Sequence, residues 1–176
     1  VDQALTQSGI ALTEDQRNQF SRHFVDGLEP ALTTPRKGKL YTNALLFALP
    51  LLKNECNPVD LMLIEGVRVF YPELYRAIRS NPDLFVSGTD TYVGKDGKAT
   101  ERLSTIITNA LQGLDINHVN LVRTHLIGSL FPRTTAMGYG SEWDITWAKE
   151  QRVCSHEYFQ RYFTYSVPNR DVPDLA

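Results

Sequence analysis

TTPRKGKLYTNALLFALPLLKNECNPVDLMLIEGVRVFYPELYRAIRS, residues 33–80, is the densest apolar block of the chain, and this stretch decides the fold. Thr34 followed by Pro35 predicts the start of a helix, because a hydroxyl side chain caps free amides and proline fits the first helical position. Pro50 should kink or end that helix near Leu49. By the helical period, the helix carries one narrow apolar stripe made of Leu40, Ala44, Phe47 and Leu51.

The first turn of this helix is rich in positive charge. Arg36, Lys37 and Lys39 stand where the helix dipole favours acidic side chains. This placement is mildly unfavourable unless an anion lies nearby, and free helix amides beside cations bind phosphate or carboxylate. The sequence therefore predicts an anion-binding position at Arg36, Lys37 and Lys39.

A second helix is predicted from Asn57 and Pro58, which repeat the same capping pattern. Nearly every position from 59 to 70 is apolar, which is typical of a central helix. The polar residues Asp60, Glu65 and Arg68 fall on one arc of roughly 140° by the helical period. Glu65 and Arg68 are three residues apart and are expected to pair along the helix.

The rest of the chain predicts further helices and no alternating strand. Thr13 and Gln16 form a capping-box pattern before a helix that ends near Gly27, and Asn117 is the expected cap of a later helix. Residues 86–98 form a glycine-bearing polar segment, predicted as a mobile loop, and residues 133–145 are expected to be irregular. We predict an all-α fold of about seven to nine helices in one compact domain. Its expected parts are an N-terminal block (1–85), the loop (86–98) and a C-terminal block (99–176), with helices over 73–79, 100–111, 117–130, 147–151 and 156–165.

Composition excludes several classes of protein. The 176 residues carry 42% hydrophobic and 22% charged side chains, which is ordinary for a globular protein, and the net charge of −2 gives no general attraction to nucleic acid or anionic lipid. No apolar run approaches the ~20 residues needed to span a bilayer. The two cysteines suit a reducing compartment, so we expect the cytoplasm or the cytoplasmic face of a membrane. The chain begins with valine, which favours a piece of a longer protein.

Several segments together resemble a known family. TPRKGKLYTNAL and ALPLLKNECNPVDLMLIEGVRVFYPELYRAIRSNPDLF are similar to the C-terminal helical part of the KAP family of P-loop NTPases. The similarity resumes at Leu130-Phe131-Pro132 and in RVCSHEYFQRYFTYSVPNRDV, residues 152–172, and it covers about half of the chain. The resemblance implies that the nucleotide-binding core lies upstream of Val1. That core would bind ATP and Mg²⁺, and the present residues would contribute no cofactor site of their own.

The chain itself lacks the phosphate-binding loop of such enzymes. A Walker A loop needs G-x-x-x-x-G-K-[S/T], in which glycine amides surround the phosphates and the hydroxyl holds magnesium. The nearest segment, GTDTYVGKD at 88–96, has five residues between its glycines and Asp96 in place of the hydroxyl. Because no serine or cysteine nucleophile has a recognisable surrounding motif either, we expect no catalysis by these residues alone.

The resemblance implies a lid and transmitter role for the helical part. By analogy with lid arginines in related ATPases, Arg36 would reach the terminal phosphates, and the upstream core would be the partner. This chain departs from the family at Gly38, where an apolar residue is usual, and at Leu40, where the family has another arginine. The alternative for Arg36 is a surface arginine paired with acids of a neighbouring helix, and the alternative for Glu65 and Arg68 is a coupling element facing the core. The family includes phage-exclusion proteins and membrane-associated scaffolds, and the sequence does not choose between them.

Other candidate sites are weaker. His118, His125, Cys154 and His156 lack the CxxC or HxxxH pairs of zinc sites, so no metal site is predicted. Cys154 beside Arg152 is either a thiol of lowered pKa or a packed structural cysteine, and packing is favoured. The aromatic row Tyr158, Phe159, Tyr162 and Phe163 is typical of a helix packed in the core, although it also resembles a base-stacking platform.

A second hypothesis comes from a different functional class. The chain is then a stand-alone helical interaction module that binds a protein or, less favoured, a nucleic acid. Its contact surface would combine the cations of 36–39 with Arg76 and Arg79. A salt-dependent affinity for DNA or RNA would support the nucleic-acid form of this hypothesis.

Overall fold

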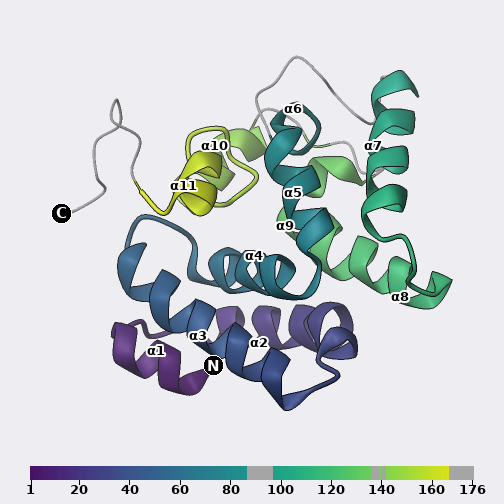
Figure 1. Ribbon diagram of the computed structural model, residues 1–176. Coiled ribbons are helices and arrows are strands. Elements are labelled where there is room, and N and C mark those ends of the chain that lie inside the picture. The colour runs from purple at the N-terminus through teal and green to yellow at the C-terminus, as the bar shows by residue number, and fades with distance from the viewer. Residues whose placement is uncertain (87–96, 136–138, 140–141, 167–176) are drawn as a thin grey trace.

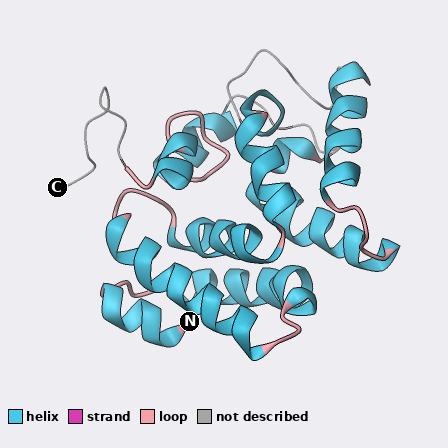
Figure 2. Ribbon diagram, viewed as in Figure 1, coloured by secondary structure: helices cyan, strands magenta, loops and turns pink. Residues whose placement is uncertain are grey.

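The computed structural model describes residues 1–86, 97–135, 139 and 142–166. These residues contain helices and turns and no strand, so the predicted all-α class is confirmed for the described part of the chain (Figures 1 and 2). The described residues form eleven α-helical segments, and two of them, α8 and α9, join through a π turn into one continuous helix. This number exceeds the expected seven to nine because short segments such as α6 form separate turns.

The N-terminal layer consists of helices packed around α4 (Pro58–Phe70). Both α1 and α4 pack against α3, α2 packs against α4, and Figure 1 shows α1, α2 and α3 below α4. Thr13 forms the predicted capping box with Gln16, and Asn57 caps α4 by accepting hydrogen bonds from the amides of Val59 and Asp60. The other elements of this layer are α1 (Asp2–Ser8), α2 (Glu14–His23), the π turn η1 (Phe24–Leu28), the 3₁₀ turn η2 (Glu29–Ala31) and α3 (Pro35–Leu51).

The remaining helices cover the other side of α4. Tyr71 separates α4 from α5 (Pro72–Ser80), as the Tyr71-Pro72 pair predicts. One cluster of buried hydrophobic residues extends from Ala4 to Phe163 and so includes residues of both predicted blocks. The elements that follow α5 are α6 (Pro82–Phe85), α7 (Gly97–Ala110), α8 (Ile116–Leu121), η3 (Val122–Ile127), α9 (Gly128–Leu130), η4 (Pro132–Thr134), α10 (Glu142–Lys149) and α11 (Phe159–Thr164).

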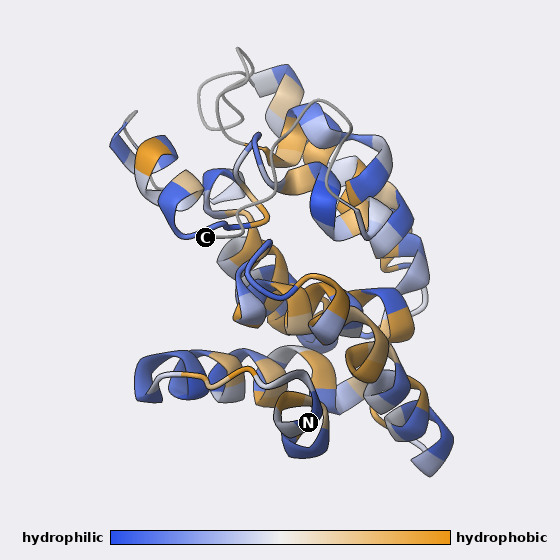
Figure 3. Cartoon of the chain, turned by 90° about the vertical axis from the view of Figure 1, so that its left-hand side faces the viewer, coloured by the Kyte–Doolittle hydropathy of each residue, from blue (hydrophilic) through white to orange (hydrophobic). Residues whose placement is uncertain are grey.

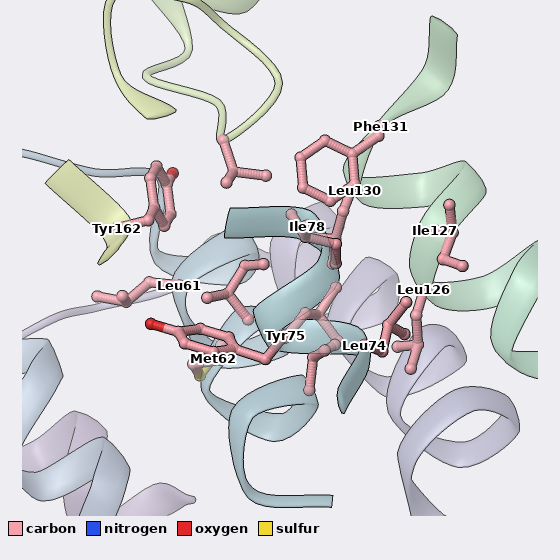
Figure 4. Packing of buried hydrophobic residues seen from close by; sticks show 14 of the residues in the cluster. Leu61, Met62, Leu74, Tyr75, Ile78, Leu126, Ile127, Leu130, Phe131 and Tyr162 are labelled. Carbon is pink, nitrogen blue, oxygen red and sulfur yellow. The ribbon is translucent and has the colours of Figure 1, made fainter. Parts of the chain in front are cut away.

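The core is centred on α4, whose residues are buried on nearly every side. Hydrophobic positions, orange in Figure 3, gather where the helices meet. Figure 4 shows Leu61 and Met62 of α4 in one cluster with three residues from later elements. These are Leu126 of η3, Phe131, which follows α9, and Tyr162 of α11. The polar arc predicted for α4 is therefore not a solvent-facing stripe, because Asp60 and Glu65 are both 0% exposed.

The buried acids near α4 are matched by arginines from the C-terminal part of the chain. Arg152 Nε donates to Asp60 Oδ2 at 2.8 Å, and Arg161 Nη1 donates to Glu55 Oε2 at 2.7 Å. The Tyr162 hydroxyl donates to the Gln151 carbonyl at 2.6 Å. These contacts stabilise the packing of residues 151–162 on the start of α4.

Some element boundaries differ from the prediction. Asp115, not Asn117, caps α8, because its carboxylate accepts hydrogen bonds from the amides of Asn117 and His118. The segment expected to be irregular over 133–145 includes η4 and the start of α10, and α11 begins at Phe159 rather than at His156. Gly97 and Lys98, assigned to the loop, belong to α7, whereas residues 87–96 of that loop, including all of GTDTYVGKD, lie outside the described residues. Within the described part of the chain, no helix has the length and apolar character needed to cross a bilayer.

Candidate functional site

One side of α3 faces solvent along its whole length. Arg36, Lys39, Leu40, Asn43, Phe47, Pro50 and Leu51 are all exposed at helical spacing, and we call these seven residues the α3 face. The opposite side of the helix is buried against α4 and α1. Of the apolar stripe identified in the sequence, only Ala44 is buried, because a second apolar row on α3 occupies the core. That row consists of Tyr41, Leu45, Ala48, Leu49 and, just beyond the helix, Leu52.

The N-terminal end of the α3 face is cationic. Thr34 Oγ1 accepts a hydrogen bond from the Lys37 amide at 3.3 Å, so the predicted cap is present. The first turn contains no acidic residue. Lys37 folds back and donates from Nζ to the Ala31 carbonyl at 2.9 Å. Arg36 and Lys39 are exposed, and neither forms an ion pair or a side-chain hydrogen bond with any residue that the structure describes.

These positions bear on the predicted anion site. The alternative to phosphate contact was an ion pair between Arg36 and acids of a neighbouring helix. Among the described residues, Arg36 forms no such pair. The Lys37 ammonium already donates to a backbone carbonyl, so its role differs from that of the two exposed cations, Arg36 and Lys39. The two exposed cations lie three residues apart, so they occupy the same side of the helix. This end of α3 therefore presents positive charge that the described fold leaves unneutralised.

The C-terminal end of the α3 face is apolar. Phe47 is 60% exposed, and Leu40 and Leu51 are each 49% exposed. Single exposed apolar residues are common, but three large ones on one helix face form a patch of the kind found at contact surfaces. A shallow groove of about 370 Å³ adjoins this patch. It is lined by Leu40, Asn43, Ala44, Phe47, Arg68 and Val69.

A buried carboxylate lies behind the groove. Glu65 Oε2 accepts from Arg68 Nε at 3.0 Å and from Arg68 Nη2 at 2.5 Å, and Glu65 Oε1 accepts from the Tyr165 hydroxyl at 2.6 Å. The side chain of Glu65 is fully buried, whereas that of Arg68 is 38% exposed. The structure thus contains the intrahelical pair that the spacing predicts and adds a third member, Tyr165.

Tyr165 connects this cluster to the α3 face. Its ring meets Phe47 edge-on, with ring centroids 5.6 Å apart, and the guanidinium of Arg68 lies 5.9 Å from its ring centroid. Burial raises the pKa of Tyr165, and the hydrogen bond to the Glu65 carboxylate raises it further. Sequence reasoning missed Tyr165, because it lies 100 residues from Glu65 and no local spacing links the two.

The other candidate residues do not form a site with the α3 face. Arg76 pairs with Glu73 on α5, the helix that also carries the exposed Arg79. His118 contacts the Tyr71 hydroxyl, and His125 lies near Asp26. In the part of the chain that the structure describes, no group of three or more histidines, cysteines or acids is placed to hold a metal ion.

The remaining sequence candidates belong to the core. Cys154 is 1% exposed, and burial raises its pKa to about 12 despite the nearby charge of Arg152. The alternative of a reactive thiol with a lowered pKa is therefore wrong. Phe159, Tyr162 and Phe163 are buried, so the aromatic row packs inside and does not form a base-stacking platform.

Comparison of the chain with models of protein families, with curated proteins and with solved structures found no match.

Proposed function

We propose that this chain is the helical lid and transmitter of an ATP-hydrolysing P-loop NTPase similar to the KAP family, and that it docks on the nucleotide-binding core through the α3 face. The observation that supports this proposal is the division of that face into two halves. Arg36 and Lys39, exposed and without partners among the described residues, occupy one end, and a patch of large apolar side chains occupies the other. A lid that covers a phosphate group needs both a cation and a surface that packs on protein.

In this proposal the cationic end faces the nucleotide. The terminal phosphates of ATP gain negative charge density during transfer, and a positioned guanidinium stabilises that charge in a site from which water is excluded. ATP and Mg²⁺ would be held by the core. Arg36 would add its charge only when the lid is closed, and Lys39 would support it from the next turn.

The apolar end supplies the docking energy and the route for transmission. Burying Leu40, Phe47 and Leu51 against the core removes apolar surface from water, which favours association by about 25 cal/mol per Å². Phe47 also contacts Tyr165, which binds the buried Glu65 of α4. A shift of Phe47 on docking would therefore move Tyr165, and through it would displace α4 and the C-terminal end of α11.

The phosphate contact is tested by Arg36→Ala in the full-length protein. We expect kcat for ATP hydrolysis to fall on the order of 10²-fold, as when one positioned group that stabilises transition-state charge is removed. Arg79→Ala, which removes an exposed arginine from α5, is the matched control and should leave kcat unchanged. Unchanged kcat and KM for Arg36→Ala would remove the proposed phosphate role.

The docking surface is tested separately, with the 176-residue chain and the nucleotide-binding core added in trans. Phe47→Ser should weaken binding of the chain to the core at least about tenfold, because about 1.4 kcal/mol corresponds to a factor of ten in affinity. Val25→Ser is the control, since Val25 is 51% exposed but lies on η1, outside the α3 face. Equal affinities for the two variants would contradict docking through α3.

The gene provides the first check. Sequencing the coding DNA upstream of Val1 should reveal G-x-x-x-x-G-K-[S/T] after an apolar strand. A stop codon and a separate start site there would overturn the lid proposal. In that case the α3 face favours a stand-alone module that binds an acidic and partly apolar protein segment, because the apolar half of the face offers nothing to a phosphate backbone. Nucleic-acid binding that weakens steeply with salt would contradict that second function.

A further inference from the structure

Three of the four histidines gather at one contact between helices. His23 ends α2, His118 lies on α8, and His125 lies on the π turn η3. Their common location is where η1, the continuation of α2, packs against η3. His156, the fourth histidine, is exposed and precedes α11.

The two π turns approach each other closely. A Cβ atom added to Gly27 of η1 would lie 2.6 Å from Leu126 Cγ of η3, so only glycine allows this separation. The Tyr71 hydroxyl donates to the Gly27 carbonyl at 2.7 Å and also lies 2.8 Å from His118 Nε2. π turns inserted in helices are rare and are frequent at functional positions. A contact between two such turns is a place where a small change of charge acts on tightly packed backbone.

His23 and His125 face each other across this contact. Their ring centroids are 5.9 Å apart. His125 Nδ1 lies 3.4 Å from Asp26 Oδ2, and the side chain of His125 is 22% exposed. His23 Nδ1 is buried and has no hydrogen-bond partner among the described residues. A buried imidazole nitrogen without an acceptor has nothing to stabilise an added proton.

Burial and most of the surrounding charges oppose protonation of His23. Burial lowers the pKa of His23 below its ordinary value of 6.5, and His125, Arg22 and Arg152 lower it further. Asp60 raises it, but Asp60 already accepts hydrogen bonds from Arg152 Nε and the Val153 amide. Asp26 is 42% exposed, so water screens its charge. The charged or titratable groups that act on His23 are His125 of η3, Arg22 of α2, Arg152 after α10 and Asp60 of α4, while Asp26 of η1 lies against His125 and His118 of α8 contacts Tyr71 beside the same turns.

We propose that His23, at its contact with His125, is an acid-sensitive switch: while the His23 ring is neutral η1 packs on η3, and its protonation at mildly acidic pH opens this contact. The opened state exposes the His23 ring to water, where it takes up a proton at its ordinary pKa. Because the open state binds more protons, the closed state loses stability as pH falls below about 6.5. One proton taken up only on opening raises the opening constant by up to about tenfold per pH unit. This proposal is independent of the proposed lid function.

Hydrogen exchange of the 176-residue chain at pH 7.5 and pH 5.5 tests the switch. After correction for intrinsic exchange rates, we expect amides of residues 24–28 and 122–127 to exchange up to about tenfold faster at pH 5.5. His23→Gln and His125→Gln should each reduce this pH dependence. His156→Gln is the matched control and should retain it in full.

Two results would overturn the switch. One is an exchange rate at η1 and η3 that does not change with pH, and the other is full pH dependence in both His23→Gln and His125→Gln. If a glutamine variant does not fold, NMR titration of the wild-type imidazoles decides the question. A pKa of His23 below 6.5 supports the proposal, and a value of 6.5 or above overturns it.

Discussion

Single buried charges determine how far this fold tolerates substitution. Asp60 is 0% exposed and is bound by Arg152, so Asp60→Asn leaves an arginine in the interior without its counter-charge. We expect Asp60→Asn to lower the free energy of unfolding by about 3–5 kcal/mol, the usual cost of removing one member of a buried ion pair. Urea unfolding at pH 7 measures this loss. Glu73→Gln breaks an exposed pair with Arg76, in which both side chains are more than 60% exposed, and should cost less than about 1 kcal/mol. Equal losses in the two variants would contradict the role given to burial.

Side-chain partners can be predicted from the sequence only when they are close together along the chain. The pair of Glu65 and Arg68 follows from a spacing of three on one helix, so it is predictable from local geometry. The partner of Asp60 is 92 residues away, and nothing in a single sequence connects them. Tyr165, which completes the cluster behind the α3 face, was missed for the same reason.

Helix elements were predicted best where their signals are local. Thr34 and Asn57 cap α3 and α4 as predicted, because a cap bonds amides two or three residues away. The outward orientation of Leu40 and Phe47 was not predictable, because α3 carries two apolar rows and periodicity does not say which one meets α4. The location of the candidate site therefore depends on tertiary packing, although its cations were identified from the sequence.

Two helical glycines test how closely elements approach. Gly27→Ala would place a Cβ 2.6 Å from Leu126 Cγ and force η1 away from η3, which should destabilise the fold by about 1–3 kcal/mol. Gly38→Ala in α3 would meet only Leu32 Cδ1, at 3.6 Å, and should stabilise the fold by about 0.5–1 kcal/mol, because alanine favours the helix. Thermal unfolding of both variants measures the opposite signs. Stabilisation by both substitutions would show that the η1–η3 contact relaxes without cost, and destabilisation by Gly38→Ala would contradict the open space beside Gly38.

At the scale of the whole molecule, the C-terminal segment closes the core over the start of α4. Asn57, at the start of α4, donates from its amide to the Tyr162 hydroxyl at 2.9 Å, and that hydroxyl donates to the Gln151 carbonyl. Each of the two segments joined by this contact carries one free cysteine, Cys56 just before α4 and Cys154 in the returning segment. They are 4% and 1% exposed, and burial raises the pKa of both thiols. The rate at which each cysteine reacts with a thiol reagent therefore measures how often the contact between the two segments opens.

We expect neither thiol to react at pH 8 while the chain is folded, and both to react in concentrated urea, because only the thiolate attacks and burial disfavours it. Tyr162→Phe removes the hydroxyl that joins the two segments and should accelerate both reactions to a similar extent. His156→Gln, an exposed change in the same segment, should leave both rates unchanged. Mass spectrometry of the labelled cysteines follows each rate separately. Acceleration of Cys154 alone would show that the C-terminal segment opens without exposing the start of α4, and that the chain does not close as one unit.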